Sequence, residues 1–479
     1  MTALGAKPLA DEHMPGRRAP NIVLIHVDDL GWTDLGCFGS GFYETPRLDA
    51  LADQGCRLPN AYAASPVCSP SRASLMTGRV PARVGITQWI GGSSVGALLD
   101  VPYHHGLPSS EYTLPRALRD GGYVTWHVGK WHLGAGAQGP TGHGFDVNIA
   151  GGEIGSPATY FAPWGIDHLP EAEAGTYLTD ALTDHAIDLV RTHDGRRPFF
   201  LHLAHYAVHV PLQAPAELVE KYERKAREQG LDPESGVEDG EFHTMWGSRD
   251  KRIRRRTVQS HPVYAAMIEN LDTNVGRLLD AMEAEGILED TMIVFTSDNG
   301  GLVTAEGSPT SCAPLAEGKG WTEEGGVRIP LIVRLPGGVA SSACTEVIAH
   351  GPDLYPTLLD AAGLPPVPMQ HADGVSLLPW LRGTADPASR GPIFWHYPHY
   401  SNQGGRPSAA VRQGRYKLIR FFEDEHCELY DLEQDVGEQH DLAAALPEVV
   451  EELRDALARH LREVGALIPQ RNPWPEPFG

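Results

Sequence analysis

The stretch Asn21–Val27, with the sequence NIVLIHV, runs directly into two carboxylates, Asp28 and Asp29. Its aliphatic residues follow one another without the polar alternation of a strand that has one face in water. A short continuous apolar run of this kind is typical of a strand buried on both faces. We therefore predict that this segment is a central strand of a sheet covered by helices on both sides.

The same pattern recurs along the chain and alternates with helical patterns. Further short apolar runs lie at residues 124–128, 198–203, 291–296 and 329–333, and apolar residues with helical spacing occupy residues 47–54, 114–120, 178–191 and 263–285. Alternating strands and helices indicate an α/β fold with a large, mostly parallel sheet sandwiched by helices. Functional side chains of such sheets collect at the carboxyl ends of the strands.

The pattern changes after about residue 380, which indicates a second, smaller domain. Short strands are predicted at residues 393–397, 409–412, 416–422 and 428–431, followed by an amphipathic helix over 447–464. We predict a disordered leader over residues 1–20, a large α/β domain over 21–380, and a C-terminal α+β domain over 381–479 with an antiparallel sheet and a helix.

Composition limits the classes of partner. The 479-residue chain has a formal net charge of -23, which argues against binding to nucleic acid or to an anionic membrane. The N-terminal segment lacks the apolar core of a signal peptide, and no stretch is apolar enough to span a bilayer. We expect a cytoplasmic protein and leave the oligomeric state open, a homo-oligomer included.

The six cysteines are scattered and form no CxxC pair, which argues against a disulfide framework or a structural zinc site. They are Cys37, Cys56, Cys68, Cys312, Cys344 and Cys427.

Two predicted strands end in polar residues that suit a metal ion. Asp28 and Asp29 follow the first strand, and Asp298 and Asn299 follow the strand at 291–296. Adjacent carboxylates repel each other and need a compensating cation, and ligation by oxygen alone favours Ca²⁺, with Mg²⁺ as the alternative. Taken alone, Asp28 and Asp29 also fit a turn or a helix cap.

The segment 68–79, CSPSRASLMTGR, resembles the signature of the formylglycine-dependent sulfatases, the type I or arylsulfatase-like enzymes of the alkaline phosphatase superfamily. The resemblance spans about residues 21–435. It implies an alkaline phosphatase-like fold, hydrolysis of sulfate esters, calcium at Asp28, Asp29, Asp298 and Asn299, and oxidation of Cys68 to formylglycine (3-oxoalanine) by a formylglycine-generating maturation enzyme.

Formylglycine has a chemical rationale. Its hydrate carries two hydroxyls on one carbon: one attacks sulfur and displaces the alcohol, and the second loses its proton so that the C=O bond reforms and sulfate leaves. A hydroxyl of this group would also complete the metal site, which places Cys68 among the predicted ligands. A thiolate lacks the second hydroxyl.

The remaining site residues follow from the same resemblance. Lys130 and His132 lie in GKWHLG, with Lys130 expected to bind sulfate and His132 to accept the proton of the second hydroxyl. His209 is the expected acid for the leaving alcohol, although the chain has Val208-His209 where the family usually has Pro-His, and His205 is held in reserve. Two further cations complete the prediction. Lys319 is expected to contact sulfate and the leaving oxygen, and Arg72 to orient the diol and neutralise the nearby carboxylates.

The segment 395–405, WHYPHYSNQGG, is rich in aromatic residues and histidine. It resembles segments of carbohydrate sulfatases, so we predict an O-sulfated carbohydrate as substrate and His396 and His399 as binding residues. A strand that packs its aromatic side chains against the large domain fits equally well. The basic run KRIRRR at 251–256 is predicted to be a solvated surface insertion or a subunit contact rather than a grip for a polyanionic glycan.

Two other functions remain open from the sequence. A phosphonate monoester hydrolase or phosphodiesterase shares the fold and can share a formylglycine. A non-catalytic homologue that binds sulfated glycans while Cys68 stays a cysteine is the second, although every residue that the chemistry needs is present.

Overall fold

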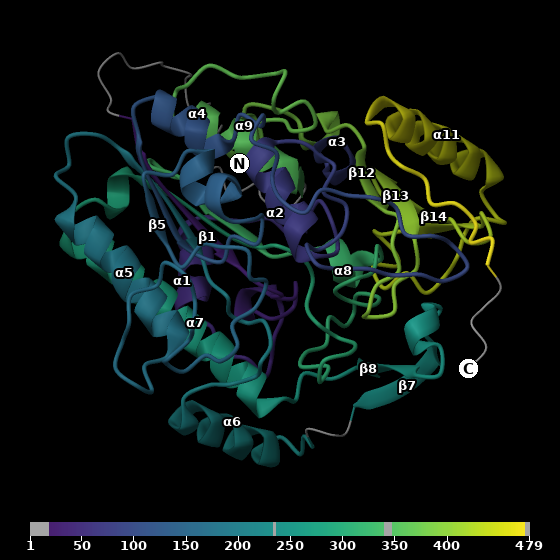
Figure 1. Ribbon diagram of the computed structural model, residues 1–479, viewed down its shortest axis with the longest axis horizontal. Helices are drawn as coiled ribbons and strands as arrows, with labels where there is room; N and C mark the ends of the chain where they lie inside the picture. The colour runs from purple at the N-terminus through teal and green to yellow at the C-terminus, as the bar shows by residue number, and fades with distance from the viewer. Residues whose placement is uncertain (1–18, 233–235, 340–346, 475–479) are drawn as a thin grey trace, which may run out of the picture.

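The computed structural model describes residues 19–232, 236–339 and 347–474. A large α/β part carries a smaller antiparallel sheet and its helix on one side (Figure 1). The predicted leader falls almost entirely on residues 1–18, outside the described residues.

The central sheet has seven strands. β1 (Asn21–Val27) lies in the middle and pairs in parallel with β6 (Phe199–Ala204) and β9 (Thr291–Ser297). The full order is β2 (Cys56–Arg57), β10 (Leu331–Arg334), β9, β1, β6, β4 (Val124–Gly129) and β5 (Val147–Ile149). The mostly parallel sheet is therefore confirmed, but the predicted strand at 329–333 forms as β10 and runs antiparallel to β9 and β2.

Helices cover both faces of the sheet, as predicted. Val23, Ile25 and Val27 of β1 belong to one core, and Ile22 and Leu24 belong to the core on the opposite face. The first face is covered by α1 (Pro46–Gln54), α5 (Leu178–Thr192), α6 (Ala216–Glu228) and α7 (Pro262–Ala284), and the second by α2 (Cys68–Thr77), α4 (Leu114–Asp120) and α9 (Leu354–Ala361) (Figure 1). The alternation of side chains along β1 thus divides the large part of the molecule into two hydrophobic cores.

The smaller sheet is antiparallel, in the order β12 (Ile393–Tyr397), β13 (Ser408–Gln413), β14 (Tyr416–Phe421) and β15 (Cys427–Asp431). One face packs against α11 (Pro447–Glu463) through Leu453, Leu457 and Leu461. The other face packs against Tyr62 and Val327 of the large part. Four predicted strands and one predicted helix are present within one or two residues of their expected bounds.

The basic run 251–256 is not a loop. Residues 252–256 form β8 (Arg252–Arg256), which pairs antiparallel with β7 (Val237–Phe242). Ile253 is buried between the exposed Arg252 and Arg254, as the two-residue period of a strand requires, whereas Arg256, on the same face as those two arginines, is buried at the end of the strand. The sequence concealed this because arginine occupies both faces. Shorter elements are α3 (Pro81–Val84), α8 (Glu324–Val327), α10 (Leu378–Leu381), β3 (Asn60–Tyr62) and β11 (Ile348–His350).

Two sequence expectations concern the cysteines and the membrane. Cys37, Cys68, Cys312 and Cys427 are free, but Cys56 is disulfide-bonded, so the expectation drawn from the missing CxxC pairs needs this correction. Among the described residues, no helix combines the length and the apolar character that a membrane crossing requires.

Candidate active site

The predicted metal ligands leave two neighbouring parallel strands at the same edge of the sheet. Val27 of β1 is paired with Ser297 of β9, so the residues that follow each strand emerge side by side. The Asp29 amide donates to Asp298 Oδ1 at 3.2 Å, and Asn299 Nδ2 donates to Asp29 Oδ1 at 2.8 Å. The structure therefore brings the two strand-end pairs together.

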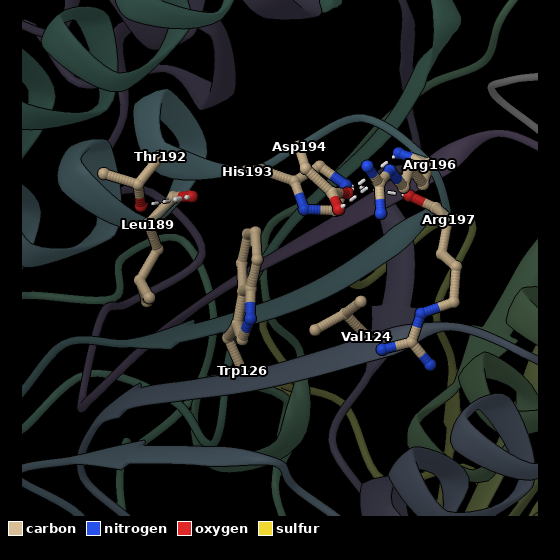
Figure 2. A pocket seen from close by; sticks show the side chains of 8 residues that line it. All are labelled: Val124, Trp126, Leu189, Thr192, His193, Asp194, Arg196 and Arg197. Carbon is tan, nitrogen blue, oxygen red and sulfur yellow. Dashed lines mark hydrogen bonds and ion pairs between the residues drawn. The ribbon is translucent and has the colours of Figure 1, made fainter.

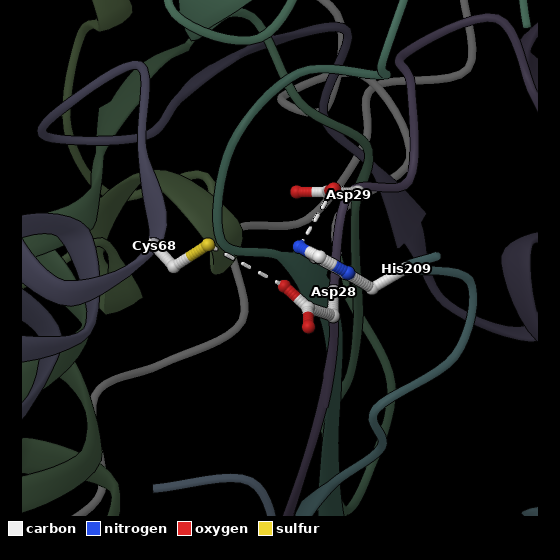
Figure 3. A group of neighbouring side chains, drawn as sticks. All are labelled: Asp28, Asp29, Cys68 and His209. Carbon is white, nitrogen blue, oxygen red and sulfur yellow. Dashed lines mark hydrogen bonds and ion pairs between the residues drawn. The ribbon is translucent and has the colours of Figure 1, made fainter. Parts of the chain in front are cut away.

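Cys68 reaches this cluster from the first residue of α2. Its buried thiol donates to Asp28 Oδ1 with a sulfur–oxygen distance of 3.7 Å, as Figure 3 shows. The backbone N–H groups and the dipole at a helix N-terminus favour negative charge at that position. The helix α2 was not predicted, because all ten of its residues are buried and leave no apolar stripe. Gly78, which ends α2 in the left-handed region, was the available signal.

Arg72 lies one turn further along α2 and faces the same cluster. Its Nε and Nη2 lie 2.9 and 2.8 Å from Asp298 Oδ2, and its Nη1 donates to the Lys130 carbonyl at 3.1 Å. Burial alone would raise the pKa of Asp298, but Arg72 and Lys130 together hold it well below its usual range. Arg72 thus fixes Asp298 in its ionised form and orients its carboxylate.

Two buried lysines neutralise the other carboxylates. Lys130 Nζ lies 2.6 Å from Asp28 Oδ2, and Lys319 Nζ lies 2.7 Å from Asp29 Oδ2. Burial raises the pKa of Asp28 to about 8 in spite of Lys130, whereas Lys319 and His209 overcome burial and lower the pKa of Asp29. Asp28, Asp29 and Asp298 therefore face an equal number of cations in Lys130, Lys319 and Arg72.

His209 is the fourth side chain around Asp29. Its Nδ1 lies 2.8 Å from the Val210 carbonyl oxygen, which can only accept a hydrogen bond, so Nδ1 carries a proton. In the neutral ring Nε2 is therefore unprotonated. Nε2 lies 3.1 Å from Lys319 Nζ and 3.5 Å from Asp29 Oδ2. Burial and Lys319 lower the pKa of His209 to about 3. In this arrangement Lys319 stays protonated and donates a hydrogen bond to the unprotonated Nε2 of His209.

His132 is buried beside the cluster with one nitrogen uncommitted. Its Nε2 lies 3.4 Å from the Ile90 carbonyl, and its Nδ1 has no hydrogen-bond partner among the described residues. A Cβ added at Gly155 would lie 2.6 Å from the His132 ring, so the glycine lets the chain pack directly on the imidazole. Burial, Lys130 and Arg72 lower the pKa of His132 well below its usual range, which keeps the ring neutral and able to accept a proton.

The donor set fits a hard cation. One ligand atom from each of Asp28, Asp29, Cys68 and His209 lies within 4.8 Å of the others (Figure 3). The Asn299 Oδ1 atom is buried and has no hydrogen-bond partner among the described residues. A buried amide oxygen beside carboxylates is a typical Ca²⁺ or Mg²⁺ ligand. His209 was not among the predicted ligands.

The two histidines predicted to bind substrate have structural partners instead. His399 is fully buried, with Nδ1 2.5 Å from Asp100 Oδ1 and Nε2 2.9 Å from Thr87 Oγ1. His396 is 6% exposed, bonds to the Leu467 carbonyl through Nε2, and packs on Phe422, which directly follows β14. Both ring nitrogens of His399 have side-chain partners, and the structure does not bring His396 to the cluster. Substrate contact by these two histidines therefore stays a prediction.

A chain of three buried histidines behind the site was also missed. His127 Nε2 lies 3.0 Å from the Gly129 carbonyl, His127 Nδ1 lies 3.0 Å from His202 Nδ1, and His202 Nε2 lies 3.4 Å from His26 Nδ1. Burial and Arg72 lower the pKa of His26 to about 3, so the ring stays neutral. The signal was available, because His26, His127 and His202 lie on three adjacent strands.

A cavity of about 570 Å³ lies at the opposite end of the sheet. It is lined by Trp126, Leu189, His193 and Arg197, among others, and includes Val124, the first residue of β4 (Figure 2). Lys130 follows the other end of the same strand. This cavity is therefore separate from the carboxylate cluster, and none of its lining residues was predicted as a site residue.

The comparisons with known proteins agree with this geometry. The family profile described as Sulfatase matches residues 20–364, and that described as N-sulphoglucosamine sulphohydrolase, C-terminal, matches residues 318–465. Human arylsulfatase A is 34% identical, with coverage of 91% of this chain and 87% of that protein. Mouse N-acetylgalactosamine-6-sulfatase is 33% identical, with coverage of 83% and 71%.

Solved structures extend the similarity to the whole fold. The structure described as Ps i-CgsB in complex with k-i-k-neocarrahexaose has a TM-score of 0.74 and 28% identity, with coverage of 96% of this chain and 95% of that one. A structure described as a complex with its substrate D-glucosamine-2-N,6-O-disulfate has a TM-score of 0.69 and 25% identity, with coverage of 94% and 98%.

Proposed function

This chain belongs to the sulfatase family and is a sulfuric ester hydrolase, and we propose that it hydrolyses an O-sulfated carbohydrate by means of a formylglycine made from Cys68. The observation that carries this proposal is the position of the Cys68 side chain. It lies at the N-terminus of α2, against Asp28 and within the group of ligand atoms around Asp29.

The unmodified thiol is poorly suited to the reaction. Burial raises the pKa of Cys68 to about 12 in spite of Lys130 and Lys319, so the side chain stays a thiol at neutral pH and is a weak nucleophile. Converted to a hydrated aldehyde, residue 68 would supply two hydroxyls on one carbon, one for attack and one for release of sulfate. Conversion to formylglycine would therefore give residue 68 the nucleophilic hydroxyl that its buried thiol cannot replace.

A calcium ion would be held by Asp28, Asp29, Asp298 and Asn299, and it would supply positive charge next to residue 68. Because Lys130, Lys319 and Arg72 equal the three carboxylates in number, a divalent cation would give the site the net positive charge that a sulfate ester requires. The two lysines bind sulfate oxygens as point charges, and Arg72 keeps Asp298 in place.

Proton transfer is assigned to the two histidines and Lys319. His132 Nδ1, uncommitted and neutral, accepts the proton of the second hydroxyl. Lys319 donates to His209 Nε2, so the ammonium holds the proton for the leaving alcohol and the imidazole orients it. This assignment refines the sequence prediction, in which His209 alone was the acid.

The carbohydrate substrate rests on the relatives. Two of the similar proteins are named or described by a sulfated sugar, N-acetylgalactosamine-6-sulfatase and the complex with D-glucosamine-2-N,6-O-disulfate, and a third is in complex with a neocarrahexaose. Each match covers more than two thirds of this chain. A carbohydrate is common to the three descriptions, and a sulfated sugar to the first two.

Two measurements test the proposal. Mass spectrometry of the peptide that contains residue 68, from protein co-expressed with a formylglycine-generating enzyme, is expected to find a mass lower by about 18 Da. Kinetics on the same preparation are expected to favour 4-nitrophenyl sulfate and monosulfated sugars over bis(4-nitrophenyl) phosphate. A preference for the phosphate diester by orders of magnitude, or binding of sulfated sugars without turnover, would overturn the proposal.

A further inference from the structure

The rim of the site contains a turn whose backbone is unusual. Ala305, Glu306 and Ser308 have φ angles of 57°, 44° and 44°, and Gly307 between them has 93°, so four consecutive residues are left-handed. The left-handed conformation is unfavourable for each of the three non-glycine residues. A strained turn of this kind persists only where the surrounding structure holds it, and strain of this kind clusters at functional sites.

The basic strand β8 holds the turn, which gives the run 251–256 a role. The Arg256 amide donates to the Val303 carbonyl at 3.1 Å, and its guanidinium donates to the Ser308 carbonyl. Ser308 Oγ donates to the Arg254 carbonyl at 3.3 Å, and residues 255 and 304 form an antiparallel bridge. β8 therefore fastens both ends of the turn.

The turn carries Glu306 to the mouth of the sulfate site. Asn402 Nδ2 lies 3.4 Å from Glu306 Oε1, and Ser401 and Gln403, the chain neighbours of Asn402, both pack against Gly320, which follows Lys319. This places the Glu306 carboxylate on the Lys319 side of the site. Desolvation of the carboxylate raises the pKa of Glu306, and Lys319 opposes this shift while Asp29 adds to it.

A carboxylate here opposes the binding of an anion. Sulfate is drawn to Lys130 and Lys319, and a negative charge beside Lys319 weakens that attraction. Such a group is useful only if it contacts the uncharged part of the substrate. Sugar hydroxyls and amino groups are hydrogen-bond donors, and a carboxylate is a strong acceptor for both.

We propose that Glu306 is a specificity-determining residue that accepts a hydrogen bond from a hydroxyl or amino group of the sugar, close to the sulfated position. This rests on the proposed function and adds which sulfated sugars the site accepts. Glu306 favours sugars with a free donor at that position and disfavours those with a second sulfate or a carboxylate there, because like charges at short range repel.

Two substrates separate recognition of the sugar from an effect on the sulfate site. 4-Nitrophenyl sulfate presents sulfate without a sugar donor, whereas N-acetylgalactosamine 6-sulfate and galactose 6-sulfate present both. For Glu306→Gln we expect kcat/KM on the sugars to fall by about 10- to 100-fold, as for the loss of one hydrogen bond to a charged group. On 4-nitrophenyl sulfate it is expected to stay within about threefold or to rise, because the repulsion is removed.

Glu241→Gln is the matched control, because Glu241 lies on β7 and pairs with Arg255 of the same hairpin. This variant is expected to leave kcat/KM unchanged on the sulfated sugars and on 4-nitrophenyl sulfate. Equal losses on the aryl and sugar substrates in Glu306→Gln would assign Glu306 to the support of Lys319 and overturn the proposal, as would no change on either.

A binding measurement keeps the test independent of turnover. In a Cys68→Ser background, calorimetry is expected to find that Glu306→Gln weakens binding of galactose 6-sulfate but not of inorganic sulfate, and equal weakening would contradict the proposal. If the wild-type enzyme with formylglycine hydrolyses no sulfate ester, the proposed function fails, whereas selectivity in binding still decides the role of Glu306.

Discussion

Two buried clusters of charged residues in the described part of this molecule are alike in composition, but they differ in how completely their polar atoms are paired. The active-site cluster joins Asp28, Asp29 and Asp298 to Lys130, Lys319 and Arg72. The second, here called the junction cluster, joins Glu324 of α8 and Glu438 to Lys417 of the small sheet, with Tyr62 and Arg412.

In the junction cluster, each carboxylate oxygen of Glu324 and Glu438 has a nitrogen or hydroxyl oxygen within 2.9 Å, although Glu438 Oε1 meets Lys417 as an ion pair and not in hydrogen-bond geometry. Lys417 Nζ lies 2.9 Å from Glu324 Oε1 and 2.9 Å from Glu438 Oε1, Tyr62 donates to Glu324 Oε2 at 2.7 Å, and the Glu324 amide donates to Glu438 Oε2 at 2.6 Å. In the active-site cluster, by contrast, Asn299 Oδ1 and His132 Nδ1 have no partner among the described residues. Buried charge alone therefore does not identify a catalytic site; converging atoms that the protein leaves unsatisfied do.

The largest effect on activity is expected from Cys68→Ser. The variant lacks the precursor of the aldehyde, so turnover of 4-nitrophenyl sulfate should fall below detection. Because serine is close to cysteine in size and the thiol makes only a 3.7 Å contact with Asp28, the melting temperature should change by no more than a few degrees. Near-normal turnover in this variant would exclude the diol mechanism.

The next largest effect separates the two clusters by their response to calcium. A ligand that binds only the folded state stabilises it by about 2.7 kcal/mol at a hundred times its Kd. We expect Ca²⁺, added after chelation, to raise the melting temperature and restore turnover of the wild type.

Variants in each cluster provide the contrast. Asp29→Asn should lose the calcium-dependent rise, because it removes a predicted ligand, whereas Glu324→Gln should keep it. A rise of equal size in both variants would place the cation elsewhere.

A third prediction concerns stability rather than activity. Lys417→Met removes the ammonium between Glu324 and Glu438, both buried, and leaves two carboxylates without their main counter-charge. Breaking a buried ion pair in this way costs about 3–5 kcal/mol. Denaturant unfolding should register this loss, while kcat/KM of the folded fraction stays near the wild-type value.

The control is the double variant Lys417→Met with Glu438→Gln, which should recover part of the loss because one uncompensated charge is removed. Wild-type stability in Lys417→Met would show that the cluster contributes nothing to the packing of the small sheet on the large part.

The sequence predicted the central strands well because their signal is local. β1 and β9 are continuous apolar runs, and their carboxyl-end residues were expected to meet. The antiparallel direction of β10 was not predictable, since strand direction depends on partners far along the chain. α2 was missed because a helix buried on every side has no periodic pattern.

At the site, residue type predicted which side chains lie in the active-site cluster better than it predicted what each side chain does there. Asp28 and Lys319 lie in the cluster as expected, but His399, in a segment equally rich in aromatic residues, is fully buried between Asp100 and Thr87. A histidine side chain suits hydrogen-bonded packing and ligand contact alike, and only the structure identifies its partners. The proton on His209 Nδ1 likewise depends on one carbonyl, that of Val210.

The smallest expected effect is a pH dependence at the edge of the junction cluster. Burial, Glu438 and Glu317 raise the pKa of Glu323 to about 8, above the value of about 4.5 for a glutamate in the unfolded chain. A raised carboxyl pKa means that folding favours the protonated form, so this contribution to stability is complete below pH 4.5 and is lost as the pH rises through 8. In Glu323→Gln the side chain cannot ionise. Its melting temperature, relative to the wild type, should therefore rise by a few degrees between pH 5 and pH 8.5, whereas Glu451→Gln on the exposed face of α11 should show no such trend. A constant difference across this range would mean that Glu323 is ionised in the folded protein at neutral pH, and that the junction cluster tolerates one more negative charge than its cations balance.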